Sequence, residues 1–226
     1  MWFVAVLAAC GGDLDQPWDL DHDRIVAIRA TPPAILAGET SKLDGLLSGK
    51  GTATSETGPL QVIVVQPESL ADTLSQDADG TWIVTAPEEA RLAAARTELG
   101  LEATDPVPLQ LGVAFTTSLA GVKSVQLGTS SSNPTLGAMQ FNGETAPAPD
   151  VELVVGPLVD VPLSIEALET DDVNWLTNVG EMHDFDLPSA YVRVEEDNEI
   201  SEGELAVVLR DDRGGVTWQV WPIRVE

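Results

Sequence analysis

The chain has 226 residues, of which 43% are apolar, and its 37 acidic and 11 basic residues give a net charge of −26. This length allows one large domain or two of about 100 residues, and the apolar content excludes wholesale disorder. A polyanion is repelled by nucleic-acid phosphates and by anionic headgroups, so nucleic acid is excluded as a partner, and neutral or cationic partners are favoured.

The N-terminal residues have the pattern of an export signal. Residues 2–9, WFVAVLAA, are uninterrupted apolar and end in small residues, as the apolar region and cleavage site of a signal peptide do. They are too few to span a bilayer, which needs about 20 residues. We expect residues 1–9 to be the end of a longer signal, since no basic residue precedes the apolar run. Cys10 is the only cysteine, so no disulfide is possible; the alternative role for it is burial in a short strand.

Residues 11–23, GGDLDQPWDLDHD, are rich in aspartate and show no regular period. We interpret residues 10–23 as an acidic tether in which Trp18 is exposed. The segment lacks the glycine and the glutamate of an EF-hand loop, so calcium binding is not predicted here.

From Arg24 onward, short alternating segments bounded by Gly, Pro, Asn or Ser predict β-strands. In the first half these are 24–30, 41–47, 60–65, 81–85, 108–117, 122–127 and 136–141. One helix is predicted at about 87–99, with Leu92, Ala95 and Leu99 as its apolar stripe and Gly100 at its end. A second short helix is expected at 67–74.

The stretch GETAPAPD at 143–150 has the composition of a linker, so we place a first domain at 24–145 and a second at 148–226. Further strands are predicted at 151–155, 161–168, 173–178, 190–194, 204–210 and 216–225. Their period-2 alternation and short turns favour antiparallel β-sandwiches over a barrel or an α/β fold. The fold class is therefore mainly β, with two sandwich domains and one inserted helix in the first.

Two sets of residues resemble known families. Leu7-Ala8-Ala9-Cys10 resembles the bacterial lipobox, which implies cleavage before Cys10, acylation of its thiol and anchoring in a membrane. Gly11 lacks the aspartate that retains such lipoproteins at the inner membrane, which implies the outer membrane of the cell envelope, with the protein facing the periplasm or the exterior.

The run RIVAIRATPPAILAGETSKLDGLLS, and Trp175 with VGE at 179–181 and the closing LRDDRGGVTW, are similar to immunoglobulin-like domains of bacterial surface lipoproteins. The resemblance covers about half of the chain and implies an architecture without an activity. Two features depart from it: no cysteine pair bridges the sheets, and the helix is an addition.

No pattern in the sequence identifies a catalytic residue, a cofactor site or a metal site. His183 lies among acidic residues in EMHDFD, where a solvated loop is the better interpretation than a metal cluster. GLLSGKGT at 45–52 has the wrong spacing for a P-loop, and SQDADGTWIVTA at 75–86 lacks the first and last ligands of an EF-hand. The latter is interpreted as a turn before a strand.

Alternation places Trp175 and Trp218 in the core and Trp221 on the opposite, exposed face, where it would be able to stack on a sugar. In an immunoglobulin-like sandwich the loops that carry the pairs Asp171-Asp172 and Asp211-Asp212 emerge at one end. These carboxylates would either bind calcium or be neutralised by Arg213 and salt; we favour the second.

These observations lead to a non-enzymatic, lipid-anchored envelope protein whose β-sandwich domains bind a protein or a glycan or serve a structural role. The alternative is a surface hydrolase or carbohydrate-active protein with an unrecognised carboxylate or aromatic site.

Overall fold

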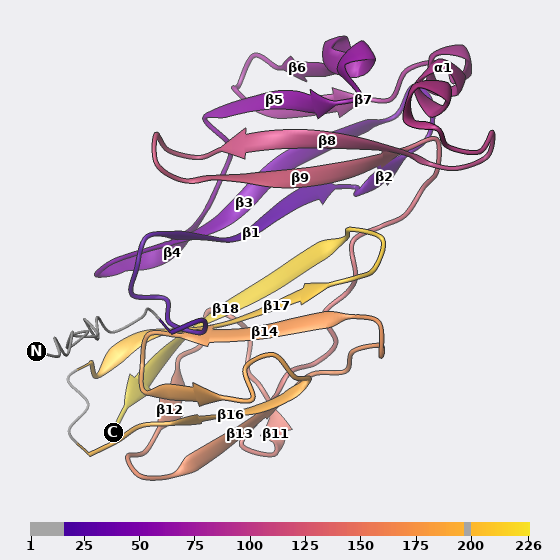
Figure 1. Cartoon of the computed structure of the whole chain (residues 1–226). Coiled ribbons are helices and arrows are strands. Elements are labelled where there is room, and N and C mark those ends of the chain that lie inside the picture. The colour runs from indigo at the N-terminus through magenta and orange to yellow at the C-terminus, as the bar shows by residue number, and fades with distance from the viewer. Residues whose placement is uncertain (1–15, 197–199) are drawn as a thin grey trace, which may run out of the picture.

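The computed structural model describes residues 16–196 and 200–226. It is mainly β and contains two β-sandwiches, one above the other in Figure 1. Residues 1–9, which were predicted to be an export signal, and Cys10 lie outside the described residues. Two large apolar clusters, one inside each sandwich, form separate cores. The mainly β, two-sandwich fold class is thereby confirmed.

The first sandwich consists of two sheets, which we call sheet 1 and sheet 2. Sheet 1 has the order β2 (Ala34–Ile35), β9 (Ala120–Leu127), β8 (Val107–Ala114), β5 (Gln61–Gln66). Sheet 2 has the order β1 (Arg24–Thr31), β3 (Thr40–Gly49), β7 (Trp82–Thr85), β6 (Leu74–Gln76), and β4 (Thr52–Thr57) also pairs with β3.

The second sandwich consists of sheets 3 and 4. Sheet 3 has the order β12 (Leu153–Val155), β18 (Val216–Val225), β17 (Glu202–Arg210), β14 (Asp172–Thr177). Sheet 4 has the order β11 (Glu144–Thr145), β10 (Gln140–Phe141), β13 (Asp160–Ser164), β16 (Ser189–Arg193), β15 (Glu181–His183).

The strand order of both sandwiches is that of an immunoglobulin-like domain. In each, one sheet contains the first, second, fifth and fourth strands of that fold, and the other contains the third, sixth and seventh. A short additional strand pairs in parallel with the seventh strand of each domain: β2 with β9 in sheet 1, and β12 with β18 in sheet 3. The remaining pairs between named strands are antiparallel, as the period-2 pattern predicts.

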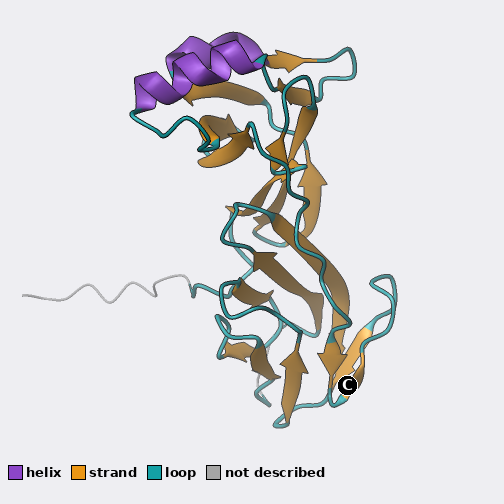
Figure 2. Ribbon diagram, turned by 90° about the vertical axis from the view of Figure 1, so that its right-hand side faces the viewer, coloured by secondary structure: helices purple, strands orange, loops and turns teal. Residues whose placement is uncertain are grey.

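The predicted helix is present as α1 (Glu89–Leu99), and the predicted short helix is a 3₁₀ helix, η1 (Glu68–Thr73). Leu92 and Ala95 of α1 are buried in the first core, and Gly100 ends the helix with a φ of 68°. Figure 2 shows the helices at the end of the molecule farthest from the second sandwich. None of the helices among the described residues is long and apolar enough to cross a membrane.

The two sandwiches meet earlier in the chain than the sequence indicates. β10 and β11 pair in sheet 4, where β10 is hydrogen-bonded to β13, so residues 140–145 belong to the second sandwich and not to the first. Met139 is already part of the second core. The predicted boundary between the domains, at residues 145–148, is therefore wrong: the second sandwich already includes Met139. The Pro-rich stretch 146–150 is a loop between two strands of this one sandwich.

The N-terminal acidic segment is not a free tether where the structure describes it. The amide of Leu20 donates to the carbonyl oxygen of Thr177, and the amide of Thr177 donates to the carbonyl oxygen of Trp18, at 3.1 and 2.9 Å. Trp18 packs on the second core, and Leu20 is 1% exposed. The expectations of a tether extending to residue 23 and of an exposed Trp18 are wrong, because two apolar side chains outweigh the acidic composition around them.

Trp221 is buried, so the prediction of an exposed face for it is also wrong. Trp175 and Trp221 are 0% and 2% exposed and lie together in the second core. Their indole N–H groups donate to the carbonyl oxygens of Leu187 and Pro147, at 2.9 and 3.0 Å. Both faces of β18 are covered: Trp221 faces the second core, whereas Trp218 on the opposite face belongs to a different apolar cluster. Alternation along this strand therefore does not distinguish a buried face from an exposed one.

Truncation of Trp221 tests this assignment. We expect Trp221→Ala to lower the free energy of unfolding by about 3–5 kcal/mol, the usual cost of removing a buried aromatic side chain. Urea unfolding followed by circular dichroism measures the change. Leu168→Ala, at a side chain that is 67% exposed, serves as the control and should change stability little. A neutral Trp221→Ala would place this residue on the surface.

Candidate functional site

The joint between the two sandwiches is a packed interface of two sheets. The outward faces of sheets 2 and 3 lie against each other, so that β1, β3 and β4 are stacked between sheet 1 and sheet 3 (Figure 1). A third apolar cluster fills the joint. Its buried members are Leu20, Val26, Ala27, Leu46, Leu176, Ala206, Val208, Val216 and Trp218.

A bulge in β1 adapts this strand to the two cores. The pairing with β3 shifts register between Ile25 and Ala27, so Val26 and Ala27 both face the joint, whereas Ile25 packs on the first core. The segment 24–30 was predicted to alternate, and strict alternation would place Ile25 and Ala27 on one face; for these two residues the prediction is wrong. An extra residue in one strand changes which side chains share a face.

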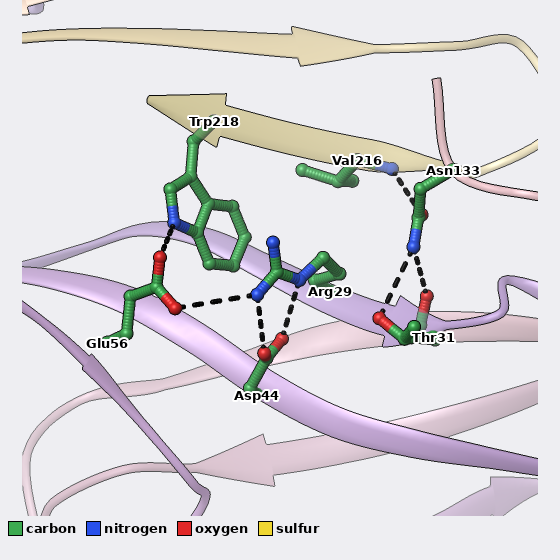
Figure 3. Close-up of polar contacts among 8 residues, drawn as sticks. Arg29, Thr31, Asp44, Glu56, Asn133, Val216 and Trp218 are labelled. Carbon is green, nitrogen blue, oxygen red and sulfur yellow. Dashed lines mark hydrogen bonds and ion pairs between the residues drawn. The ribbon is translucent and has the colours of Figure 1, made fainter. Parts of the chain in front are cut away.

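A network of polar side chains lies at the edge of this apolar joint (Figure 3). The Arg29 guanidinium donates to both carboxylate oxygens of Asp44, at 3.0 and 2.6 Å, and its carbon lies 3.8 Å from the ring centroid of Trp218. The indole N–H of Trp218 donates to Glu56 Oε1 at 2.6 Å, and Glu56 Oε2 lies 3.6 Å from the guanidinium. Trp218 thus completes an ion-pair network of the other domain, and this network fixes one orientation.

Asn133, in the connection between the sandwiches, bonds to both of them. Its amide nitrogen donates to the carbonyl oxygen of Ala30 at 2.9 Å, and its amide oxygen accepts from the Val216 N–H at 2.8 Å. Arg210 of β17 donates to the carbonyl oxygen of Val26 at 2.8 Å. Burial lowers the pKa of Arg210, and the negative charge of Asp172 acts in the opposite direction.

Lys123 of β9 links the first sandwich to a hairpin of the second. Its ammonium donates to the carbonyl oxygen of Gly214 at 2.6 Å, and the residue is 7% exposed. Burial lowers the pKa of Lys123 to about 8. Arg210 lowers it further, while Asp211 and Asp44 act in the opposite direction.

Beside the joint, a groove of about 710 Å³ opens at the loop end of the second sandwich. The connection 132–137, the loop 166–171 and the β17–β18 hairpin line it, so Asp171, Asp211 and Asp212 share one end of the domain. Asp172 does not line the groove; it lies opposite Arg210 in the strand pairing.

Two of the groove carboxylates, those of Asp171 and Asp211, accept hydrogen bonds within their own turns. Asp211 Oδ1 accepts from the amides of Gly215 and Arg213 at 2.6 and 3.0 Å, and Asp171 Oδ2 accepts from the Leu168 amide at 2.9 Å. Asp212 lies 3.8 Å from the Arg213 guanidinium. Within residues 16–196 and 200–226, no three His, Cys, Asp or Glu side chains form a group able to hold a metal ion.

The other residues considered from sequence occupy ordinary structural positions. His183 lies in β15, stacked on Tyr191 with ring centroids 4.5 Å apart, and its Nε2 is 3.8 Å from Glu181. In the stretch 75–86, Asp77 and Asp79 accept from backbone amides in the β6–β7 turn. Hydrogen bonds with the side chains of Asp77 and Thr81 and with the Thr81 backbone amide lower the pKa of Asp79 to about 2.

Sequence reasoning missed the joint, although one signal for it exists. Residues 205–209 of β17, LAVVL, are all buried, since the odd-numbered side chains face the second core and Ala206 and Val208 face the joint. A continuous apolar run is typical of a strand covered on both faces, whereas a half-exposed strand alternates. The run therefore indicated a second layer over sheet 3.

The comparisons with known proteins add little to this description. No family model and no curated protein matches the chain. Similar solved structures include a tandem of titin Ig domains, with 11% identity and a TM-score of 0.28, covering 90% of this chain and 98% of that one. Another is the structure of fibronectin(III)-like modules of Clostridium thermocellum CbhA, with 14% identity and a TM-score of 0.28, covering 88% of this chain and 94% of that one.

A nucleoside hydrolase-related hypothetical protein from Saccharophagus degradans is also similar, with 14% identity and a TM-score of 0.33. The match covers 42% of this chain and 26% of that protein, so the chain spans about a quarter of its length. The immunoglobulin-like fold is established by the strand order.

A double-mutant cycle tests the network across the joint. We expect Arg29→Met and Trp218→Leu to be coupled by about 1 kcal/mol in urea unfolding, since a cation over a desolvated indole contributes roughly 0.5–2 kcal/mol. Arg91→Met, at an exposed ion pair with Asp72, combined with Trp218→Leu should show no coupling. Additive effects in the first cycle would mean that the two side chains do not interact in solution.

The buried Lys123 predicts a specific pH dependence. Its folded-state pKa, about 8, is below the ordinary 10.5, so between these values the unfolded chain binds more protons and stability rises with pH. The rise amounts to at most about 3 kcal/mol, at 1.36 kcal/mol per pKa unit. It should be lost in Lys123→Met and kept in Lys50→Met, as measured by urea unfolding at pH 7.5, 9 and 10. Parallel curves for all three proteins would refute a buried, charged Lys123.

Proposed function

We propose that this protein is a non-enzymatic, lipid-anchored envelope protein that presents two β-sandwiches as one rigid unit for binding or structural interaction. The observation that carries the proposal is the joint. Domains within a chain move relative to each other unless their interface is large and hydrophobic. Here an apolar cluster fills the contact, and at its edge Trp218 of the second sandwich stacks on Arg29, which pairs with Asp44. A fixed orientation is of use to a scaffold or a binding surface.

The proposed anchor is Cys10, through the lipobox-like Leu7-Ala8-Ala9-Cys10. Because residues 16–23 lie against the sandwiches, only residues 10–15 remain to connect an acylated Cys10 to the folded protein. At about 3.3–3.6 Å per residue, they reach at most about 20 Å. Acylation would therefore hold the joint close to the membrane, and at a net charge of −26 the acyl chains must supply the affinity for a surface with anionic headgroups.

The proposed partner is a protein or a glycan recognised by an exposed surface. The alternative of a carbohydrate-active protein or hydrolase loses its aromatic candidate, because Trp221 is buried in the second core. The carboxylates of Asp171 and Asp211, which were considered as calcium ligands, accept hydrogen bonds from backbone amides in their own turns. The acidic balance continues to disfavour nucleic acid.

Expression in a Gram-negative host behind a complete upstream signal tests the anchor. We expect the protein in the outer-membrane fraction with incorporated labelled palmitate, and we expect Cys10→Ser to abolish the label and release the protein in soluble form. Gly11→Asp serves as a matched variant, which should keep the label and move the protein to the inner membrane. Equal partitioning of the wild type and Cys10→Ser, without label in either, would rule out the lipoprotein assignment.

A further inference from the structure

The outward face of sheet 1 is an apolar surface that none of the described residues covers. Sheet 1 packs on the first core with one face only, and its other face presents Ile63 and Val65 of β5 and Val122 of β9. These side chains are 54%, 52% and 68% exposed. Most large apolar residues elsewhere on the described surface lie in loops, whereas these three lie on β5 and β9, the two strands that flank β8 in one sheet.

This face carries no charge, which sets it apart in a chain of which 21% of the residues are charged. The outward residues of β5, β8 and β9 are apolar, glycine, proline, serine or glutamine. Residues 106–143 contain a single charged residue, Lys123. Its side chain points away from this face and donates to Gly214 in the second sandwich.

The face also has a shape that fits itself. A shallow hollow of about 190 Å³ lies over small residues of β8 and β9, including Gly112, Ala114 and Ala120, and Ile63 borders it. At Gly112 an added Cβ would lie 3.1 Å from Ile63 Cγ1, so this glycine lets Ile63 lean over β8. Beside the hollow, Val122 projects. A two-fold axis would place Val122 of each copy in the hollow of the other, which is the reciprocal contact of a symmetric dimer.

We propose that the outward face of sheet 1 binds a second copy of this chain, face to face. The reciprocal fit of Val122 with the hollow points to a second copy as the occupant. Charge then favours this face for the contact: two copies that each carry −26 repel where carboxylates meet, and no outward residue of β5, β8 or β9 is a carboxylate. The same chain already buries the equivalent face of its second sandwich, because sheet 3 is covered by sheet 2 at the joint.

The size of the face predicts a weak dimer. Three strands about 4.8 Å apart and about 26 Å long give a flat area of roughly 400 Å² per copy. The two copies together bury on the order of 800–1,000 Å², below the 1,200 Å² of a standard stable interface. We therefore expect dissociation constants in the micromolar range or weaker, which the high local concentration of an anchored protein would offset. In this respect the dimer deepens the proposed binding function, although its test below does not depend on the anchor.

Sedimentation equilibrium of a chain that lacks residues 1–10, and so keeps every described residue, tests the proposal. Over 5 µM to 1 mM in 150 mM NaCl, we expect a monomer–dimer equilibrium that Val122→Glu weakens at least tenfold. Val159→Glu is the matched control, since Val159 is 54% exposed outside sheet 1, and it should leave the equilibrium unchanged. Circular dichroism and the unfolding midpoint confirm that both variants fold.

Cross-linking locates the contact directly. Without Cys10 the chain has no cysteine, so Val122→Cys introduces a unique thiol that should form a disulfide-linked dimer under mild oxidation, while Val159→Cys should not. A chain that stays monomeric to 1 mM, or a dimer that Val122→Glu does not weaken, overturns the proposal. Because lipidation is absent from both experiments, neither outcome bears on the proposed anchor.

Discussion

The central constraint on this fold is that sheet 3 is apolar on both faces. Trp221 and Leu205 pack into the second core, while Trp218 and Val208 point the other way. Sheet 4 can cover only one of these faces, so the other must be covered by the first sandwich. The two domains are consequently not independent modules joined by a linker. They are four sheets in a stack, in which the middle contact has the same character as the two sandwich cores.

Other features of the chain follow from this contact. The N-terminal segment reaches the joint because Leu20 belongs to its cluster. The β1 bulge supplies a second apolar side chain to it, and the connection between the domains is held there by Asn133. The basic groups described at the joint each have a partner: Arg29 is held by Asp44, Lys123 by the carbonyl oxygen of Gly214, and Arg210 by that of Val26.

The sequence predicted local structure better than long-range packing. Each segment expected to be a strand overlaps a strand of the fold, and α1 begins and ends close to its predicted limits, because alternation, prolines and capping glycines act locally. The polar β4, TATSET, has no apolar alternation and was not predicted. The environment of Trp221, the start of the second sandwich and the role of Trp18 depend on which sheet covers which face, and a one-dimensional period does not encode that. The groove at the loop end was partly foreseen from topology, whereas the polar network of the joint was not.

The attachment of the N-terminal segment has a mechanical consequence. Trp18 and Leu20 dock at the edge of β14, so tension applied at the N-terminal end enters the molecule beside the joint rather than at the tip of a rod. The first sandwich then extends from the point of attachment as a lever arm with α1 near its free end (Figure 2). Before such a load can act on β1, it must peel the segment away from Thr177. The docked segment thus bears tension applied to the N-terminal end before that tension reaches the stacked sheets.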